Sequence, residues 1–274
     1  MNNKDISRQY VDTGVRLPEY QVNKLKGGLL NTYLRKRLIA IKVANSSIEI
    51  YEFKLLSDEQ IKSNIDYLGV GRANIFQLLS NNLKKYWIDY LLNTDAYLTD
   101  NLFTKSDSEI RNYYLSKTNW ISNPFISNCT NDELKIYINR IKFDNDDDSP
   151  NPFEYDSYSL LNSEMKNYYI NHLLSIKDSY IDDRMFNEFS DKQKQIYLNY
   201  TIERHDYLTQ DQYDYCSKLQ KDDYIKNYDG HHRLPDEIFT TLDYKLKLLF
   251  VKNRIAINMP LTNSQKNWAE KNNI

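Results

Sequence analysis

The chain has 274 residues, enough for one elongated domain or two compact ones. Its 36 basic and 38 acidic residues give a net charge of -2, so no overall charge selects nucleic acid or an anionic membrane. Only 6 glycines and 6 prolines are present, too few turn-forming residues for an all-β sandwich or barrel, and 2 cysteines cannot build a disulfide framework. We therefore expect an all-α protein from a reducing compartment.

The first part of the chain, residues 1–57, is predicted to be an N-terminal arm carrying a basic helix. Residues 1–42 have a charge balance of +6, whereas residues 43–244 carry -13 of the total charge. Apolar residues at helical spacing predict an amphipathic helix over residues 29–41. Alternation by twos over residues 47–53 allows one short strand, which would need a partner strand.

The basic helix is the candidate partner-binding site. Its basic residues would supply charge and its apolar residues would supply contact area. The candidate residues are Leu30, Tyr33, Leu34, Arg35, Lys36, Arg37 and Leu38. We expect them to meet an acidic protein surface, but nucleic acid is an alternative partner because clustered basic side chains neutralise phosphates. A solvated helix face is the third interpretation.

Residues 58–274 form the second predicted region, in which one short sequence pattern, called the recurring phrase below, is repeated about every 27 residues. A basic residue on a helical run is followed, usually three positions later, by an aromatic or aliphatic residue. The basic positions are 84, 111, 135, 166, 194, 221, 245 and 266. On this spacing, Tyr114, Tyr169 and Tyr197 should be buried between helices.

A second, shorter helix is predicted in each unit. Thr99, Ser122, Thr209 and Asp236 stand where a helix N-cap is expected. Neither helix of a pair is long enough to be stable alone, so neighbouring units must bury one another's apolar faces. The pattern resembles the α-solenoid class, which includes HEAT, armadillo and tetratricopeptide arrays. The resemblance is architectural, because those families have longer units and their consensus residues are not found here.

One acidic segment is a candidate ion site. Asp144, Asp146 and Asp148 are spaced like the first ligands of an EF-hand loop, but Ser149 replaces the glycine and Tyr155 replaces the final glutamate of that motif. A solvated loop inserted between two units is the favoured interpretation.

Histidine and cysteine residues offer little further chemistry. Residues 229–233 place two histidines beside an aspartate, but no nearby ligand completes a metal set, so this segment is interpreted as a turn. Cys129 and Cys216 lack a neighbouring histidine and are expected to be small packed side chains.

No nucleotide-binding glycine loop, nucleophile elbow or zinc-ligand pair is found in the sequence. We therefore expect a non-enzymatic structural or scaffold protein without a cofactor, which binds other proteins and forms a homo-oligomer or a larger assembly. The composition, together with the layout of a basic arm followed by helical repeats, resembles the structural and accessory proteins of large AT-rich bacteriophages. That resemblance implies virion assembly, with the protein in the host cytoplasm or the virion. A nucleic-acid-binding accessory protein and an inhibitor of a host enzyme are the alternatives. Neither a signal peptide nor a membrane partner is expected.

Overall fold

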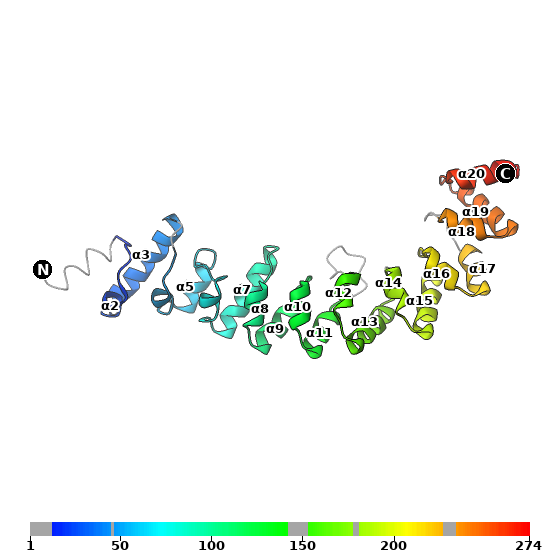
Figure 1. Cartoon of the computed structure of the whole chain (residues 1–274). Coiled ribbons are helices and arrows are strands. Elements are labelled where there is room, and N and C mark those ends of the chain that lie inside the picture. Colours follow the sequence, from blue (N-terminus) through cyan, green and yellow to red (C-terminus); the bar gives the residue numbers. More distant parts are fainter. Residues whose placement is uncertain (1–12, 45–46, 142–152, 178–180, 227–233) are drawn as a thin grey trace. The chain divides into compact units, whose positions relative to one another are not determined.

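The computed structural model describes residues 13–44, 47–141, 153–177, 181–226 and 234–274, and within these ranges every regular element is a helix (Figure 1). The chain divides into two compact units, residues 1–137 and 138–274.

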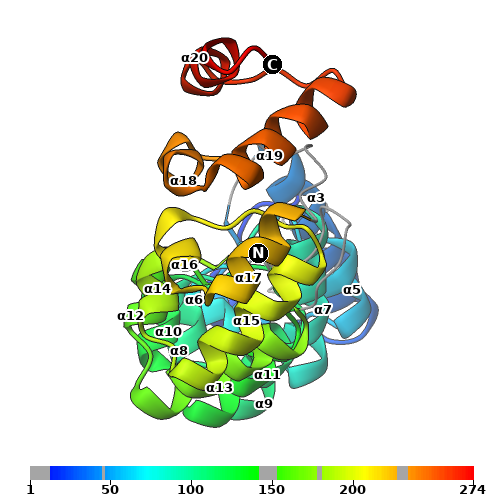
Figure 2. The same cartoon turned by 90° about the vertical axis from the view of Figure 1, so that its right-hand side faces the viewer.

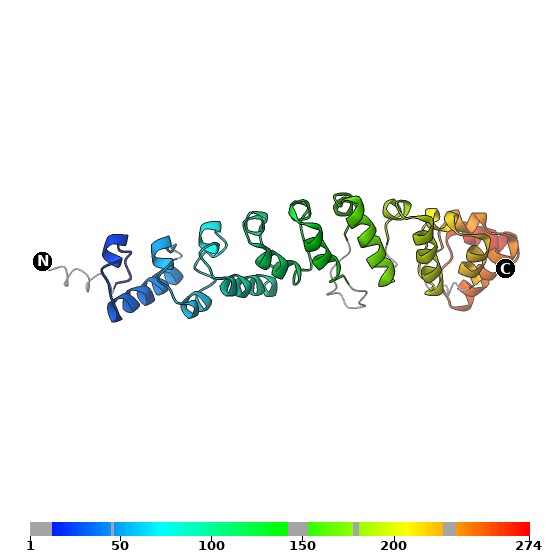
Figure 3. The same ribbon diagram turned by 90° about the horizontal axis from the view of Figure 1, so that it is seen from below.

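In the first unit, even-numbered short helices alternate with odd-numbered helices that are mostly longer. The short helices pack in the order α2, α4, α6, α8 and α10, and α7 packs against both α5 and α9. Short and long helices therefore lie in two rows (Figure 3). The helices are α2 (Glu19–Val22), α3 (Gly28–Ala44), α4 (Ile50–Phe53), α5 (Asp58–Ser63), α6 (Ala73–Phe76), α7 (Asn81–Asn93), α8 (Asp100–Thr104), α9 (Ser108–Leu115), α10 (Asn123–Asn128) and α11 (Asn131–Ile138).

The second unit has the same alternation. Its long helices pack in the order α13, α15, α17 and α19, and its short helices pack from α14 to α16 to α18, with α20 following (Figure 2). The helices are α12 (Tyr155–Ser159), α13 (Ser163–Ser175), α14 (Asp183–Asn187), α15 (Asp191–Glu203), α16 (Gln210–Tyr215), α17 (Lys218–Lys226), α18 (Asp236–Thr241), α19 (Tyr244–Ala256) and α20 (Asn263–Lys271).

Polar caps start these helices, largely where the sequence predicted. Thr99, Ser122 and Thr209 are confirmed as N-caps. The fourth prediction was one residue late: Pro235 is the N-cap of α18 and Asp236 is its first residue. Proline fits there because its fixed φ suits the entry to a helix and the missing N–H would have no intrahelical acceptor.

Several long helices end on a residue in the left-handed conformation. Asp95, Lys177, His205 and Asn258 all have φ between 52° and 61°. After three of them, the next N–H donates to the carbonyl oxygen five residues earlier, as from Asp206 to Thr201 at 2.9 Å. This geometry satisfies carbonyl groups that the end of a helix leaves without intrahelical donors.

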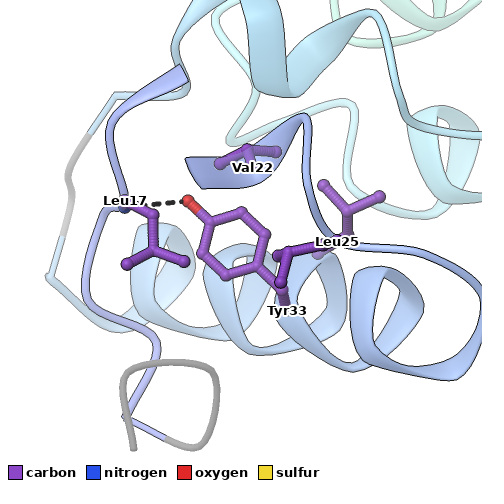
Figure 4. Close-up of a cluster of buried hydrophobic side chains, with 5 residues drawn as sticks. Leu17, Val22, Leu25 and Tyr33 are labelled. Atoms are coloured by element: carbon purple, nitrogen blue, oxygen red, sulfur yellow. Dashed lines mark hydrogen bonds between the residues drawn. The ribbon is translucent and has the colours of Figure 1, made fainter. Parts of the chain in front are cut away.

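Tyrosines of the long helices form much of the core. Tyr114, Tyr169 and Tyr197 have relative exposures of 0%, 0% and 1%, so their predicted burial is confirmed. Figure 4 shows the corresponding ring of Tyr33 among Leu17, Val22 and Leu25, with its hydroxyl accepting a hydrogen bond from the Leu17 N–H at 3.0 Å.

The tyrosine contact recurs with one fixed separation along the chain. The N–H of Phe153 donates to the Tyr169 hydroxyl at 2.6 Å, and that of Leu208 donates to the Tyr224 hydroxyl at 3.2 Å. Donor and acceptor are 16 residues apart in each case, as they are for Leu17 and Tyr33. The bond anchors the start of a short helix to the long helix that follows it.

The basic residues of the recurring phrase have a structural partner. In six of the helix pairs a basic residue lies over an aromatic ring eight residues earlier, on the preceding short helix, in a cation–π contact. The pairs are Lys84 with Phe76, Arg111 with Phe103, Lys166 with Tyr158, Lys194 with Phe186, Lys221 with Tyr213 and Lys247 with Phe239, at 4.6–5.8 Å from the ring centroid. In α19 this contact belongs to Lys247, two residues after the predicted position 245.

The possible strand over residues 47–53 is wrong. Residues 47–49 have no regular structure, and α4 begins at Ile50. Glu49 and Glu52 form a capping box that starts the helix, and Glu52 turns inward to a buried arginine. The alternation of polar and apolar residues therefore reflects one helical turn with a buried glutamate, not a strand with one solvent-exposed face.

Candidate functional site

A buried ion pair fixes the basic helix α3 against α4. Glu52 is 0% exposed and accepts from the Arg37 Nε at 2.7 Å and from the Tyr33 hydroxyl at 2.5 Å. Its second oxygen accepts from the Arg37 Nη2 at 3.3 Å and from the Glu49 N–H at 3.1 Å. Burial, followed by the hydrogen bond to Glu52, raises the pKa of Tyr33 well above its ordinary value.

A groove lies between the basic helix α3 and the shorter helix α5. Helix α3 has 17 residues and α5 has 6, which corresponds to about 25 Å and about 9 Å of helix. The groove has a volume of about 790 Å³, within the range of ligand-sized sites. It is lined by Asn31, Arg35, Leu38, Ile39 and Lys42 of α3 and by Ser57, Glu59, Gln60, Ser63 and Asn64 around α5.

Comparable seams between long helices are bridged by glutamine. In the sequence Ser-x-x-Gln, the glutamine completes a capping box at the start of its helix. The Nε2 of Gln193 then donates to Asn167 at 3.1 Å and to Asn171 at 2.9 Å on the preceding long helix.

The next seam repeats this arrangement. The Nε2 of Gln220 donates to Gln195 at 3.1 Å and to Asn199 at 2.8 Å. In both seams the two acceptors are four residues apart, so they lie on one face of the helix that carries them.

The seam between α3 and α5 has the same motif but remains open. Ser57 and Gln60 form the capping box of α5, and the corresponding pair, four residues apart on α3, is Asn31 and Arg35. Among the described residues no hydrogen bond joins Gln60 to either of them, and all three line the groove. Arg35 replaces an amide acceptor with a cation, so this seam cannot close in the same way.

The walls of the groove are basic and partly apolar. Helix α3 contains no acidic residue, and no carboxylate within the described residues forms an ion pair with Arg35 or Lys36. Lys42 lies over the ring of Tyr67 at 5.2 Å, and Glu59 is the acidic residue of the lining.

Two apolar side chains of α3 face solvent beside these charges. Ile39, in the groove lining, is 53% exposed, and Val43, one helical turn further on, is 81% exposed. Basic charge and exposed apolar area therefore occur together at this part of α3.

The structure separates the seven predicted partner-binding residues into two sets. Tyr33, Leu34, Arg37 and Leu38 are buried within the chain's own fold, although Leu38 also reaches the groove lining. Leu30, Arg35 and Lys36 are the partly or fully exposed members, and Leu30 packs against the core around Tyr33. Sequence periodicity identified α3 but did not distinguish its inner basic residue from its outer ones.

The structure provides no support for the candidate metal sites within the described residues. Among the described residues, no three His, Cys, Asp or Glu side chains lie together as a metal site would require. The acidic segment 144–148 and the histidine segment 229–233 lie outside the described residues. His172 contacts the Ile141 carbonyl oxygen at 2.6 Å, and His205 occupies a left-handed helix end.

Both thiols should be unreactive in the folded protein. Burial raises the pKa of Cys129 and of Cys216 to about 12, so almost no nucleophilic thiolate forms at pH 8. We expect an aromatic disulfide reagent at pH 8 to label both thiols slowly in the native protein and rapidly in urea. Rapid labelling of the native chain would contradict the packing around both residues, and separate Cys129→Ser and Cys216→Ser variants would show which one reacts.

Comparisons of the chain with protein-family models, with curated proteins and with solved structures found no match. No helix in the described part of the chain combines the length and apolar character that crossing a bilayer requires.

Proposed function

We propose that the chain is a non-enzymatic helical-repeat solenoid, with a unit of about 27 residues, that binds other proteins as a scaffold or assembly component. The recurring contacts support the repeat. One pattern recurs in the sequence: an apolar residue, an aromatic residue 5 positions later and another aromatic residue 16 positions later. The pattern starts at Leu98, Phe153, Ile181, Leu208 and Leu234. The last four starts are 28, 27 and 26 residues apart.

The proposed array begins earlier than the predicted boundary at residue 58. Leu17 and Tyr33 have the same 16-residue hydrogen-bonded separation as the later pairs. Val22 takes the place of the aromatic residue and Leu30 that of the basic residue. On this proposal the basic helix α3 is the long helix of the first repeat, and residues 13–44 belong to the array.

Bonds between successive short helices give further support. Thr209 donates to Asp183 at 2.5 Å, and Thr262 donates to Asp236 at 2.5 Å, each across 26 residues. The glutamine three residues after each threonine donates to a backbone carbonyl of the preceding pair, at 3.1 Å in both cases. Such contacts between neighbours are the interactions that stabilise an array of repeats.

The observation that carries the binding function is the open groove between α3 and α5. Solenoids bind partners on surfaces formed by successive repeats, and this surface combines exposed apolar side chains with unpaired basic charge. A role in a virion or in its assembly in the host cytoplasm is part of the proposal, because such roles require protein-binding surfaces on non-catalytic chains.

The mass of the purified protein in solution tests the assembly role. We expect light scattering to give a whole multiple of the 32.8 kDa chain, at least a dimer, and nuclease treatment to leave that mass unchanged. A particle that falls to the monomer mass after nuclease treatment would favour the nucleic-acid-binding alternative. A monomer before and after treatment would overturn self-assembly.

A further inference from the structure

We infer that the groove between α3 and α5 binds an acidic amphipathic helix, about three turns long, supplied by a partner protein. This inference rests on the proposed protein-binding function and specifies the partner segment. Its support comes from the dimensions of the groove, the hydrogen-bonding groups left unused in it, its charge, and the helices that this chain itself contains.

The length follows from the two helices that form the groove. Helix α3 forms one wall, and residues from Ser57 to Asn64, along the whole of α5, form the other. The lining residues of α3 run from Asn31 to Lys42, which is about three helical turns. A helix of that length would lie along α3, over the groove between the two walls.

The unused polar groups define what the occupant must offer. The Oε1 of Gln60 accepts from the Ser57 N–H at 2.9 Å, which leaves its Nε2 directed at no acceptor within the described residues. Arg35 adds a guanidinium group, which binds a carboxylate through two parallel hydrogen bonds. A glutamate or aspartate on the occupant would satisfy both donors across the seam.

The charge and the apolar area fit one amphipathic segment. Arg35 and Lys42 are the cations of the groove lining, opposed by Glu59. Leu38 and Ile39 lie between these cations in the sequence, and Val43 extends the apolar area beyond Lys42. A helix with leucines on one face and acidic residues flanking them would bury this area and pair with both cations.

The described part of this chain offers no helix of that kind. Its helices of three or more turns are α3, α7, α13, α15 and α19, and each already buries its apolar residues in the core of its own unit. None of them contains more than two acidic residues. The occupant is therefore assigned to a different protein.

A pair of synthetic peptides tests the inference on the full chain. The probe is a fluorescein-labelled peptide of about 14 residues with leucines at helical spacing and glutamates elsewhere, and the control replaces every glutamate with lysine. Fluorescence anisotropy should show the acidic peptide binding at least about tenfold more tightly than the lysine peptide, with affinity falling as salt is raised.

Variants locate the binding site. Arg35→Glu should lower the affinity for the acidic peptide by about tenfold or more. Ile39→Glu should lower it by a similar factor, because it places a charge in the apolar part of the groove. Lys105→Glu is the matched control, because it makes the same charge reversal at an exposed position of this unit outside the groove lining. Circular dichroism verifies that the exposed substitutions leave the helices intact.

Each result decides for or against the inference. Equal binding of the two peptides, or Arg35→Glu behaving like Lys105→Glu, would overturn it. A change in the mass of the protein itself on Arg35→Glu would assign the groove to a second copy and would also overturn it. A protein that self-assembles but ignores the acidic peptide would retain the proposed function and lose this inference alone.

Discussion

Raising the pH above 10 should unfold this protein cooperatively, with loss of helix between about pH 11 and pH 12. Five tyrosines with hydroxyls held in or near the core are the cause. Burial raises the pKa of Tyr114 and of Tyr213 to about 12, and it raises the pKa values of Tyr33, Tyr158 and Tyr224 further. All five side chains are at most 3% exposed.

The loss of stability at high pH follows from the different pKa of each tyrosine in the folded and unfolded protein. In the unfolded chain a tyrosine loses its proton near pH 10, whereas the folded protein holds the proton to a higher pH. The stabilisation is therefore fully present below pH 10 and is lost as the pH rises above it. At pH 11 each such tyrosine lowers the free energy of unfolding by about 1 kcal/mol, so the five together lower it by several kcal/mol, comparable with the net stability of a typical protein.

Two spectroscopic signals measured together test this expectation. Tyrosinate absorbance at 295 nm should rise steeply at the pH where helical circular dichroism is lost. Tyr213→Phe is the informative variant, because no hydrogen bond from the Tyr213 hydroxyl is found in the described residues. It should leave stability at pH 7 nearly unchanged and move the alkaline midpoint upward. Helix retained beyond pH 12, with all tyrosines titrating gradually near pH 10, would contradict the proposed cause.

The helical class and the buried tyrosines could be predicted from the sequence because both follow from local spacing. A basic residue three positions before an aromatic one identifies a helix face, and the face that carries Tyr114 or Tyr169 must pack. The cation–π contact explains why the basic residue recurs: its charge covers a ring of the preceding short helix.

The recurring pattern did not identify the first helix pair, α2 and α3, because this pair lacks the basic residue. Leu30 stands where later pairs have lysine or arginine, so the phrase is absent although Tyr33 makes the same contact as Tyr169. The 16-residue separation between an apolar residue and an aromatic one was the available signal. It is a tertiary contact between two helices, which hydrophobic periodicity within one helix does not reveal.

The candidate groove could be predicted only in part. The cluster at Arg35 and Lys36 marked the correct helix, and Ser57 with Gln60 is a recognisable capping box. The groove itself arises where two helices meet, which is a tertiary feature that periodicity within one helix does not reveal.

Replacing Glu52 with alanine should lower the free energy of unfolding by about 3–5 kcal/mol, because it leaves the other member of a buried ion pair without its partner. The Arg37 guanidinium would keep its charge in a buried place, where its remaining acceptors among the described residues are the carbonyl oxygens of Gly14 and Ser47, at 3.3 and 3.5 Å. The Tyr33 hydroxyl would lose the acceptor of its proton as well.

Urea unfolding followed by circular dichroism measures this loss, and two further variants identify its origin. Glu19→Ala, at an exposed carboxylate of the same region, should leave the midpoint nearly unchanged. The double variant Arg37→Met with Glu52→Leu should recover much of the stability, because it removes both charges and fills the space with apolar atoms. If Glu52→Ala behaves like Glu19→Ala, the ion pair does not hold α3 against α4. If the double variant is as unstable as the single one, the loss comes from the geometry of the Tyr33 and Glu49 hydrogen bonds, not from the buried charge of Arg37.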